Sequence, residues 1–164
     1  MTAIPARKPA RSGLLRLALN LPLWCYRAHL GWLLGERFLM LTHVGRHSSQ
    51  PRQMILEVVR CDRKVGVYIV SSGWSQQPEW FRNIKKNSPV EIAIGESRFV
   101  AMAERVSTAE AETELRDYAR RHPLAFRALL QLVTGRRLED TTAACCLLAR
   151  ILPIVAVKTG KKMS

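Results

Sequence analysis

The sequence predicts an α+β protein built on a small barrel of about six mostly antiparallel strands with flanking helices. Strand-like segments run from residue 37 to residue 106, helical periodicity follows to residue 151, and one more apolar segment then closes the barrel. The 164 residues are 48% hydrophobic, which suits one ordinary domain with a packed core. No internal repeat or long linker interrupts the chain, so we expect the barrel and its helices within residues 36–164.

Residues 1–35 form a basic and apolar segment that precedes the barrel, and we predict one or two amphipathic helices there. Its charge-free stretch, Leu17 to Tyr26, is too short to span a bilayer. These helices either pack against the domain or lie on an anionic membrane with Trp24 and Trp32 inserted, and both interpretations stay open.

The first part of the barrel is expected to be a three-stranded meander. Arg37 to Val44 and Met54 to Val59 have strand patterns, and Gly45 to Pro51 between them is rich in turn residues. A turn at Cys61 to Lys64 then leads to a third strand, Val65 to Ser72, which we expect to lie antiparallel to the second.

A short helix and a second hairpin follow. The helix is predicted to begin at Pro78, with Glu79 near its positive end. Val90 to Ile94 and Arg98 to Val106 then read as two strands joined through a turn at Gly95.

Three helices and a closing strand complete the chain. Ser107 and Glu110 have the spacing of a capping box, which marks the start of the first helix. The remaining elements are a first helix that ends before Pro123, helices over Leu124 to Val133 and Thr141 to Ile151, and a sixth strand over Ile154 to Lys158.

The chain carries a net charge of +13, which predicts an anionic partner. A nucleic-acid surface would need basic and aromatic side chains together on one exposed sheet face, and the sequence shows no such array, so we predict no nucleic-acid partner. The candidates that remain are an anionic membrane surface and a small ligand with phosphate and carboxylate groups.

The common sequence signatures of hydrolases, NTPases, metalloproteases and Rossmann enzymes are missing. The cysteines at positions 25, 61, 145 and 146 match no metal-ligand spacing, so we predict reduced structural thiols and no metal site. His29 and His43 are expected to be hydrogen-bonded structural residues. Chemistry in this chain must therefore come from a cofactor or from scattered residues.

The connection from Gly45 to Arg52 (GRHSSQPR) is the most informative segment. It brings two arginines, a histidine, two hydroxyls and several main-chain amides into a short turn, a combination that can surround a phosphate. A solvated hairpin turn is the alternative.

Three segments, Phe38 to Arg52 (FLMLTHVGRHSSQPR), Tyr68 to Trp74 (YIVSSGW) and Pro78 to Ile84 (PEWFRNI), together resemble the deazaflavin-dependent nitroreductase family, which uses coenzyme F-420. Pro153 to Val157 (PIVAV) resembles its closing strand. The resemblance implies a split β-barrel like that of pyridoxamine-phosphate oxidases. It also implies an oxidoreductase that transfers a hydride from reduced F-420 to an activated alkene, a quinone or a nitro compound, with FMN a less favoured cofactor.

The resemblance also implies which residues bind the cofactor. Arg46, Ser48 and Arg52 are expected to hold its phosphate and acidic oligoglutamate tail. Trp80 and Asn83 would border the ring pocket, the alternatives being a core tryptophan and a helix-capping asparagine. The full set is Arg46, His47, Ser48, Gln50, Arg52, Met54, Val70, Ser71, Ser72, Gly73, Trp80 and Asn83.

Two positions depart from the family pattern. His47 stands where the family has Lys, which removes a permanent charge from the tail site. Ser49 stands where the family has Gly, so we expect Ser49 to adopt a backbone angle that glycine takes more easily.

Since the coenzyme would supply the hydride, no residue has to be a nucleophile, and no catalytic residue is assigned. The proton donor is left open between Tyr118, Ser72 and solvent, and the physiological substrate and oligomeric state are open as well. The alternative function is a non-catalytic split-barrel protein that binds flavin, haem or fatty acid. We expect a cytoplasmic protein, with peripheral contact to the inner face of the plasma membrane as the open alternative.

Overall fold

Six antiparallel strands close into a barrel in the order β1-β2-β3-β6-β5-β4 in the computed structural model, which describes residues 35–71 and 78–163. The predicted fold class is therefore confirmed, while the predicted N-terminal helices lie outside the described residues. The strands are β1 Phe38–Val44, β2 Pro51–Asp62, β3 Val67–Ser71, β4 Pro89–Ile94, β5 Ser97–Arg105 and β6 Val155–Met163.

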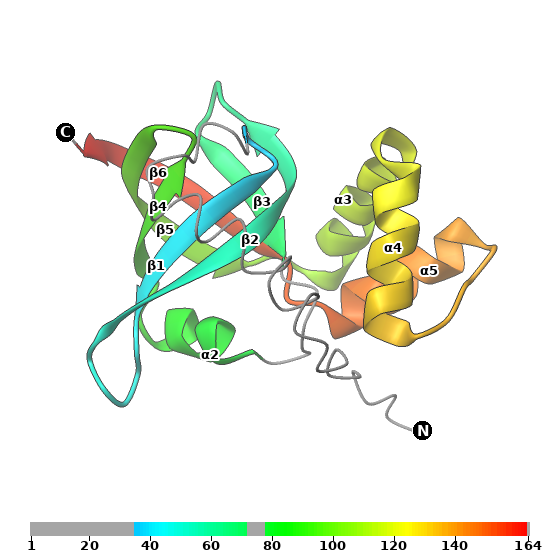
Figure 1. Cartoon of the computed structure of the whole chain (residues 1–164), viewed down its shortest axis with the longest axis horizontal. Coiled ribbons are helices and arrows are strands. Elements are labelled where there is room, and N and C mark those ends of the chain that lie inside the picture. Colours follow the sequence, from blue (N-terminus) through cyan, green and yellow to red (C-terminus); the bar gives the residue numbers. More distant parts are fainter. Residues whose placement is uncertain (1–34, 72–77, 164) are drawn as a thin grey trace, which may run out of the picture.

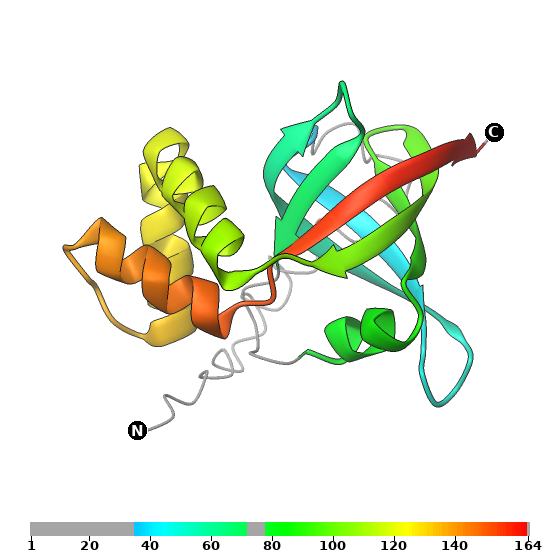
Figure 2. The same cartoon turned by 180° about the vertical axis from the view of Figure 1, so that it is seen from behind.

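The described helices occupy two places around the barrel. The α2 helix covers one end of the barrel, and α3, α4 and α5 form a separate helical lobe at its side (Figure 1 and Figure 2). The helices are α2 Glu79–Lys86, α3 Thr108–Arg121, α4 Pro123–Thr134 and α5 Thr141–Ile151. None of them is long and apolar enough to span a membrane.

Strand alternation divides the apolar side chains between two cores. Leu39 and Leu41 point into the barrel with Leu56 and Val70, and α2 closes this core through Trp80, Phe81 and Ile84. Ile69 and Ala156 lie on the outer face and pack into the core of the helical lobe instead. Val59 on β2 belongs to the same core, so the lobe is held to the barrel by the outer faces of β2, β3 and β6.

Local sequence signals set the ends of the lobe helices. The Ser107 hydroxyl and the Glu110 carboxylate form the predicted capping box at the start of α3. Gly135 ends α4 in the left-handed conformation with a φ of 69°. Asp140 accepts hydrogen bonds from two main-chain N–H groups of the first turn of α5.

Several predicted strand boundaries were wrong. β2 is longer than Met54 to Val59 because its first half pairs with β1 and its second half, past a bulge after Val58, pairs with β3. The turn consequently begins after Asp62, and Val65 lies in the turn with 67% of its surface exposed. β6 likewise continues past Lys158, since its polar end pairs with β5.

Candidate functional site

The connection between β1 and β2 is a closed loop. The N–H of Gly45 donates to the carbonyl of Gln50 at 2.9 Å, and the N–H of Ser49 donates to the carbonyl of Gly45 at 2.9 Å. A Cβ on Gly45 would lie 2.5 Å from the Ser48 hydroxyl oxygen, so a larger residue there would force the Ser48 side chain to move. Ser49 has a φ of 53°, which confirms the expected left-handed angle.

Arg46 fixes this loop to α2. Its guanidinium Nη1 donates to the Glu79 carboxylate at 2.6 Å and to Asn83 Oδ1 at 3.2 Å. Its main-chain N–H donates to the same Asn83 oxygen at 3.1 Å, and Lys86 donates to its carbonyl at 3.1 Å. The Arg46 guanidinium holds the pKa of the Glu79 carboxyl below its ordinary value. The loop and the helix therefore form one unit.

Asn83 and His43 form the buried base of this unit, with exposed fractions of 3% and 4%. The Asn83 amide nitrogen lies 3.2 Å from His43 Nδ1, and because an amide nitrogen only donates, that ring nitrogen accepts. Burial lowers the pKa of His43, and the nearby Arg52 lowers it further. The helix-cap alternative for Asn83 is wrong, because Asn87 occupies the C-cap position of α2.

The same loop presents donors that are not used within the described structure. Arg52 forms no ion pair with a described residue, and the N–H groups of His47 and Ser48 have no hydrogen-bond acceptor among the described residues. The Ser48 hydroxyl accepts a hydrogen bond of 3.4 Å from the N–H of Gln50. Two adjacent main-chain donors beside a guanidinium group suit a phosphate or a carboxylate.

Ser71 lies at the end of β3, where the ring pocket was predicted. Its side chain is 3% exposed, and its hydroxyl oxygen has no hydrogen-bond partner among the described residues. A buried hydroxyl without a partner is costly, so this atom is available to a polar ligand. Ser72 and Gly73, which complete the predicted pocket, lie outside the described residues.

The remaining predicted site residues take different places. Val70 is fully buried inside the barrel, and Met54 packs against the same core from β2. Trp80 is 4% exposed and makes an edge contact with Phe81, which agrees with the core alternative for this residue. Gln50 is exposed in the loop.

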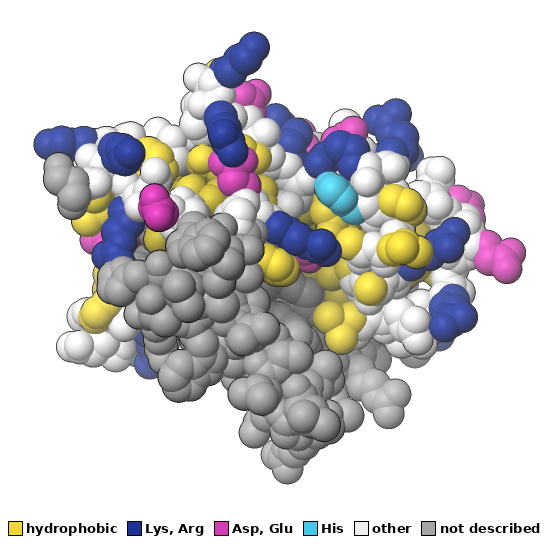
Figure 3. Space-filling model, turned by 45° about the horizontal axis from the view of Figure 1, so that its top comes forward, with side chains coloured by type: hydrophobic (Ala, Val, Ile, Leu, Met, Phe, Trp, Pro, Cys, Tyr) yellow, Lys and Arg dark blue, Asp and Glu magenta, His cyan; other side chains and the backbone are white. Residues whose placement is uncertain are grey.

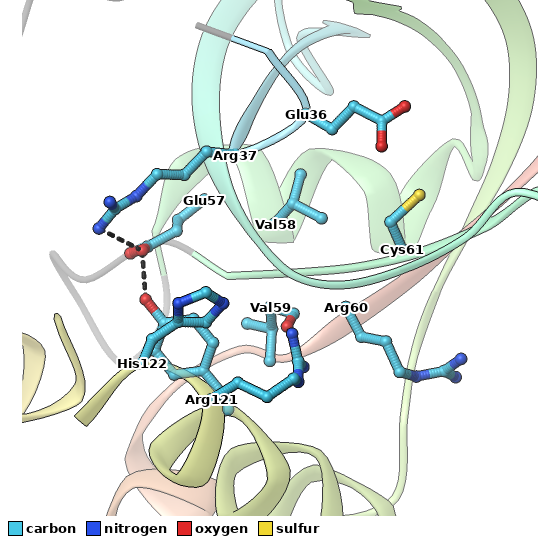
Figure 4. Close-up of a pocket in the computed structure, with 10 residues that line it drawn as sticks. Glu36, Arg37, Glu57, Val58, Val59, Arg60, Cys61, Arg121 and His122 are labelled. Carbon is cyan, nitrogen blue, oxygen red and sulfur yellow. Dashed lines mark hydrogen bonds and ion pairs between the residues drawn. The ribbon is translucent and has the colours of Figure 1, made fainter.

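Sequence reasoning missed a pocket of about 260 Å³ between β2 and α3, shown in Figure 4. Glu57 lies within it, accepts a hydrogen bond from the Tyr118 hydroxyl and has the Arg37 guanidinium at 3.8 Å. Glu57 is also paired with Ser71 across the sheet, so the two side chains share the outer face of the barrel. The available signal was a carboxylate within the apolar run MILEVV.

The other cations of this pocket already have partners. Arg60 donates to the Glu114 carboxylate at 2.9 Å, and Arg121 donates to the Val59 carbonyl at 2.9 Å and pairs with Asp117. The contacts of Arg60 with Glu114 and of Arg121 with the Val59 carbonyl join β2 to α3 and hold α3 against the barrel. Within residues 35–71 and 78–163, no group of three or more His, Cys, Asp or Glu side chains could hold a metal ion.

Comparison with known proteins gives a family match. The model of the F420H₂-dependent quinone reductase family matches residues 24–139. An F420H₂-dependent quinone reductase of Mycobacterium tuberculosis is 29% identical over 119 residues, which is 73% of this chain and 71% of that protein.

Two solved structures share the fold. An F420-H₂-dependent reductase superposes with a TM-score of 0.50 at 16% identity, covering 76% of this chain and 96% of that one. A protein of unknown function from Agrobacterium tumefaciens gives a TM-score of 0.54 at 14% identity, covering 98% of this chain and 60% of that one.

Proposed function

The chain belongs to the F420H₂-dependent quinone reductase family, and we propose that it reduces a quinone with a hydride from reduced coenzyme F-420. Membership makes it an oxidoreductase whose coenzyme is F-420. The observation that carries the proposal is the family match over residues 24–139, a span that includes the β1–β2 loop, α2 and β3. An activated alkene and a nitro compound are the alternative substrate classes.

The donors of the β1–β2 loop fit the charged part of this coenzyme. We assign Arg52, with the N–H groups of His47 and Ser48 that have no acceptor among the described residues, to the phosphate and the acidic tail. Arg46 already pairs with Glu79, so its main role in this proposal is to hold the loop on α2. His47 contributes its main-chain N–H to this site.

The end of β3 is the part of the barrel that we assign to the deazaflavin ring of the coenzyme. The hydroxyl of Ser71, which has no partner among the described residues, gives a polar heterocycle one hydrogen-bonding group, and the small residues Ser72 and Gly73 would allow a close approach of the main chain. Bound there, the coenzyme supplies the hydride. The protein binds the coenzyme, orients it and excludes water from it.

Tyr118 and Glu57 stand beside this position in the fold. The Tyr118 hydroxyl is buried and donates to Glu57, and its pKa is raised, so the phenol keeps its proton at neutral pH. We assign Tyr118 to positioning Glu57 at the edge of the proposed ring site, with solvent as the proton source for the reduced product.

The test is turnover with reduced F-420 and three electron acceptors: a short-chain quinone, a cyclic enone and a nitroaromatic compound. We expect oxidation of the coenzyme that depends on the protein and is fastest with the quinone. Faster turnover with the enone or the nitro compound would assign the substrate to that class instead. No turnover with any of the three, by folded protein that binds F-420, would contradict the proposal.

A further inference from the structure

A stripe of apolar side chains on α4 has no role in the barrel or in the candidate site. Leu124 and Leu132 are 77% and 38% exposed, and Ala128 between them is exposed as well. Residues four apart lie on one face of a helix, so the three side chains line up along α4. The opposite face of the helix is buried in the lobe core, so the stripe is an outward-facing surface.

Unpaired positive charge surrounds this stripe. Arg127, Arg136 and Arg137 form no ion pair with any described residue, and α4 itself contains no acidic residue. On the neighbouring α3, by contrast, Arg116 and Arg120 pair with carboxylates of their own helix. Figure 3 shows hydrophobic side chains reaching the surface of the lobe among Lys and Arg side chains. The α4 surface is therefore both apolar and cationic.

A groove of about 700 Å³ runs beside the stripe. Arg127 and Arg137 line it together with one carboxylate, Glu139, so the charged groups of the groove carry a net positive charge. A guanidinium group binds phosphate oxygens in a bidentate manner, which makes phosphate the ligand that this pair of arginines fits best.

We propose that the α4 surface lies on an anionic lipid bilayer. Leu124 and Leu132 enter the boundary between head groups and acyl chains, while Arg127 and Arg137 contact lipid phosphates at the groove. A two-fold contact with a second copy would bring the same arginines of both copies together, and their positive charges would repel each other. Nucleic acid is disfavoured because the side chains between the arginines are aliphatic, not aromatic. This inference does not depend on the proposed substrate.

The test is sedimentation of the full chain with vesicles of phosphatidylcholine, alone or mixed with phosphatidylglycerol. We expect binding to the mixed vesicles that weakens with salt. The pair Leu124→Ser and Leu132→Ser should lower partitioning about ten-fold or more, from the loss of buried apolar surface. The pair Arg127→Gln and Arg137→Gln should lower it at least about ten-fold at low salt.

Matched controls come from the barrel. Val65→Ser with Val100→Ser removes comparably exposed apolar groups, and Lys161→Gln with Lys162→Gln removes two charges; both pairs should sediment like the unchanged chain. All variants should keep their circular dichroism spectrum, because the substituted residues are exposed. Unchanged sedimentation of both α4 pairs would overturn the proposal. It would also be overturned if the unchanged chain self-associates without vesicles and the leucine pair abolishes that association, because the stripe would then be an interface between copies.

Discussion

Ser49 has a left-handed backbone angle in the β1–β2 loop of the candidate site. Its left-handed backbone angle was expected from the glycine found at this position in the family pattern, and the structure has it at a φ of 53°. A side chain in this region carries a steric cost of about 1 kcal/mol. The loop keeps this angle because its main-chain hydrogen bonds between Gly45, Ser49 and Gln50 close the turn.

Replacing Ser49 with glycine should therefore raise the free energy of unfolding by about 0.5–1 kcal/mol. Thermal unfolding measures the change, and coenzyme affinity should be equal or higher. The control is Ser88→Gly, outside the positive-φ region, where the added freedom of the unfolded chain should lower stability. Destabilisation by Ser49→Gly as large as that of the control would show that the strain is absent.

Arg52 is the arginine of the loop that should matter most for binding. Arg52→Gln should remove a charge-assisted hydrogen bond of about 1.5–3 kcal/mol, so affinity for F-420 should fall ten-fold or more. Arg98→Gln, an exposed arginine on β5, is the matched control and should leave affinity unchanged. Equal affinity of the Arg52 variant and the control would remove Arg52 from the tail site.

At the scale of elements, α2 matters because its side chains hold the β1–β2 loop. Asn83→Ala removes the acceptor of two Arg46 donors and the donor to His43. Losing one buried and two partly buried hydrogen bonds should lower the free energy of unfolding by about 1–3 kcal/mol and weaken coenzyme binding.

Amide hydrogen exchange in residues 45–50 separates loop release from general destabilisation. Exchange there should rise more than in α3 for Asn83→Ala, whereas Asn87→Ala, at the end of the same helix, should leave the loop protected. A uniform rise over the whole chain would contradict the role of Asn83 in holding the loop.

The contact between β2 and α3 has a pH dependence with a definite sign. Burial, and then the hydrogen bond to the Glu57 carboxylate, raise the pKa of Tyr118 above its ordinary value of about 10. The folded chain thus binds the phenolic proton more tightly than the unfolded chain does. The stability from this contact is complete below about pH 10 and is lost as the pH rises further.

Tyr118→Phe should reduce the decrease in the free energy of unfolding at alkaline pH, measured by urea unfolding at a series of pH values. Tyr68 and the thiols of Cys61 and Cys145, whose pKa values burial also raises, should contribute to the slope that remains. At neutral pH the variant should be less stable by about 1–3 kcal/mol, and a double-mutant cycle with Glu57→Gln should show coupling. An alkaline slope equal to that of the unchanged chain would contradict the assignment.

The elements themselves were largely predictable. Period-two alternation, turn residues and the capping box placed all six strands and the four described helices, because these signals are local. The length of β2 was not predictable, since its polar ends pair with different neighbours. The Glu57–Tyr118 contact joins residues 61 apart in sequence, and no local pattern encodes such a pairing.

At the scale of the whole molecule, we propose two anionic partners for the net charge of +13. In these proposals the β1–β2 loop offers cationic and main-chain donors to the coenzyme, and the α4 surface offers a membrane arginines that pair with no carboxylate in the described part of the chain. The total charge follows directly from composition. Its division between loop and lobe depends on which carboxylates neutralise which arginines, and that requires the folded structure.

Every role proposed for the β1–β2 loop and for the end of β3 requires that this barrel binds coenzyme F-420. Equilibrium titration of the full chain with F-420, FMN and haem, followed by fluorescence and absorbance, tests it most directly. We expect saturable binding of F-420, stronger than that of FMN or haem and weakened by salt and by Arg52→Gln. Folded protein that binds FMN or haem tightly and F-420 not at all would contradict it.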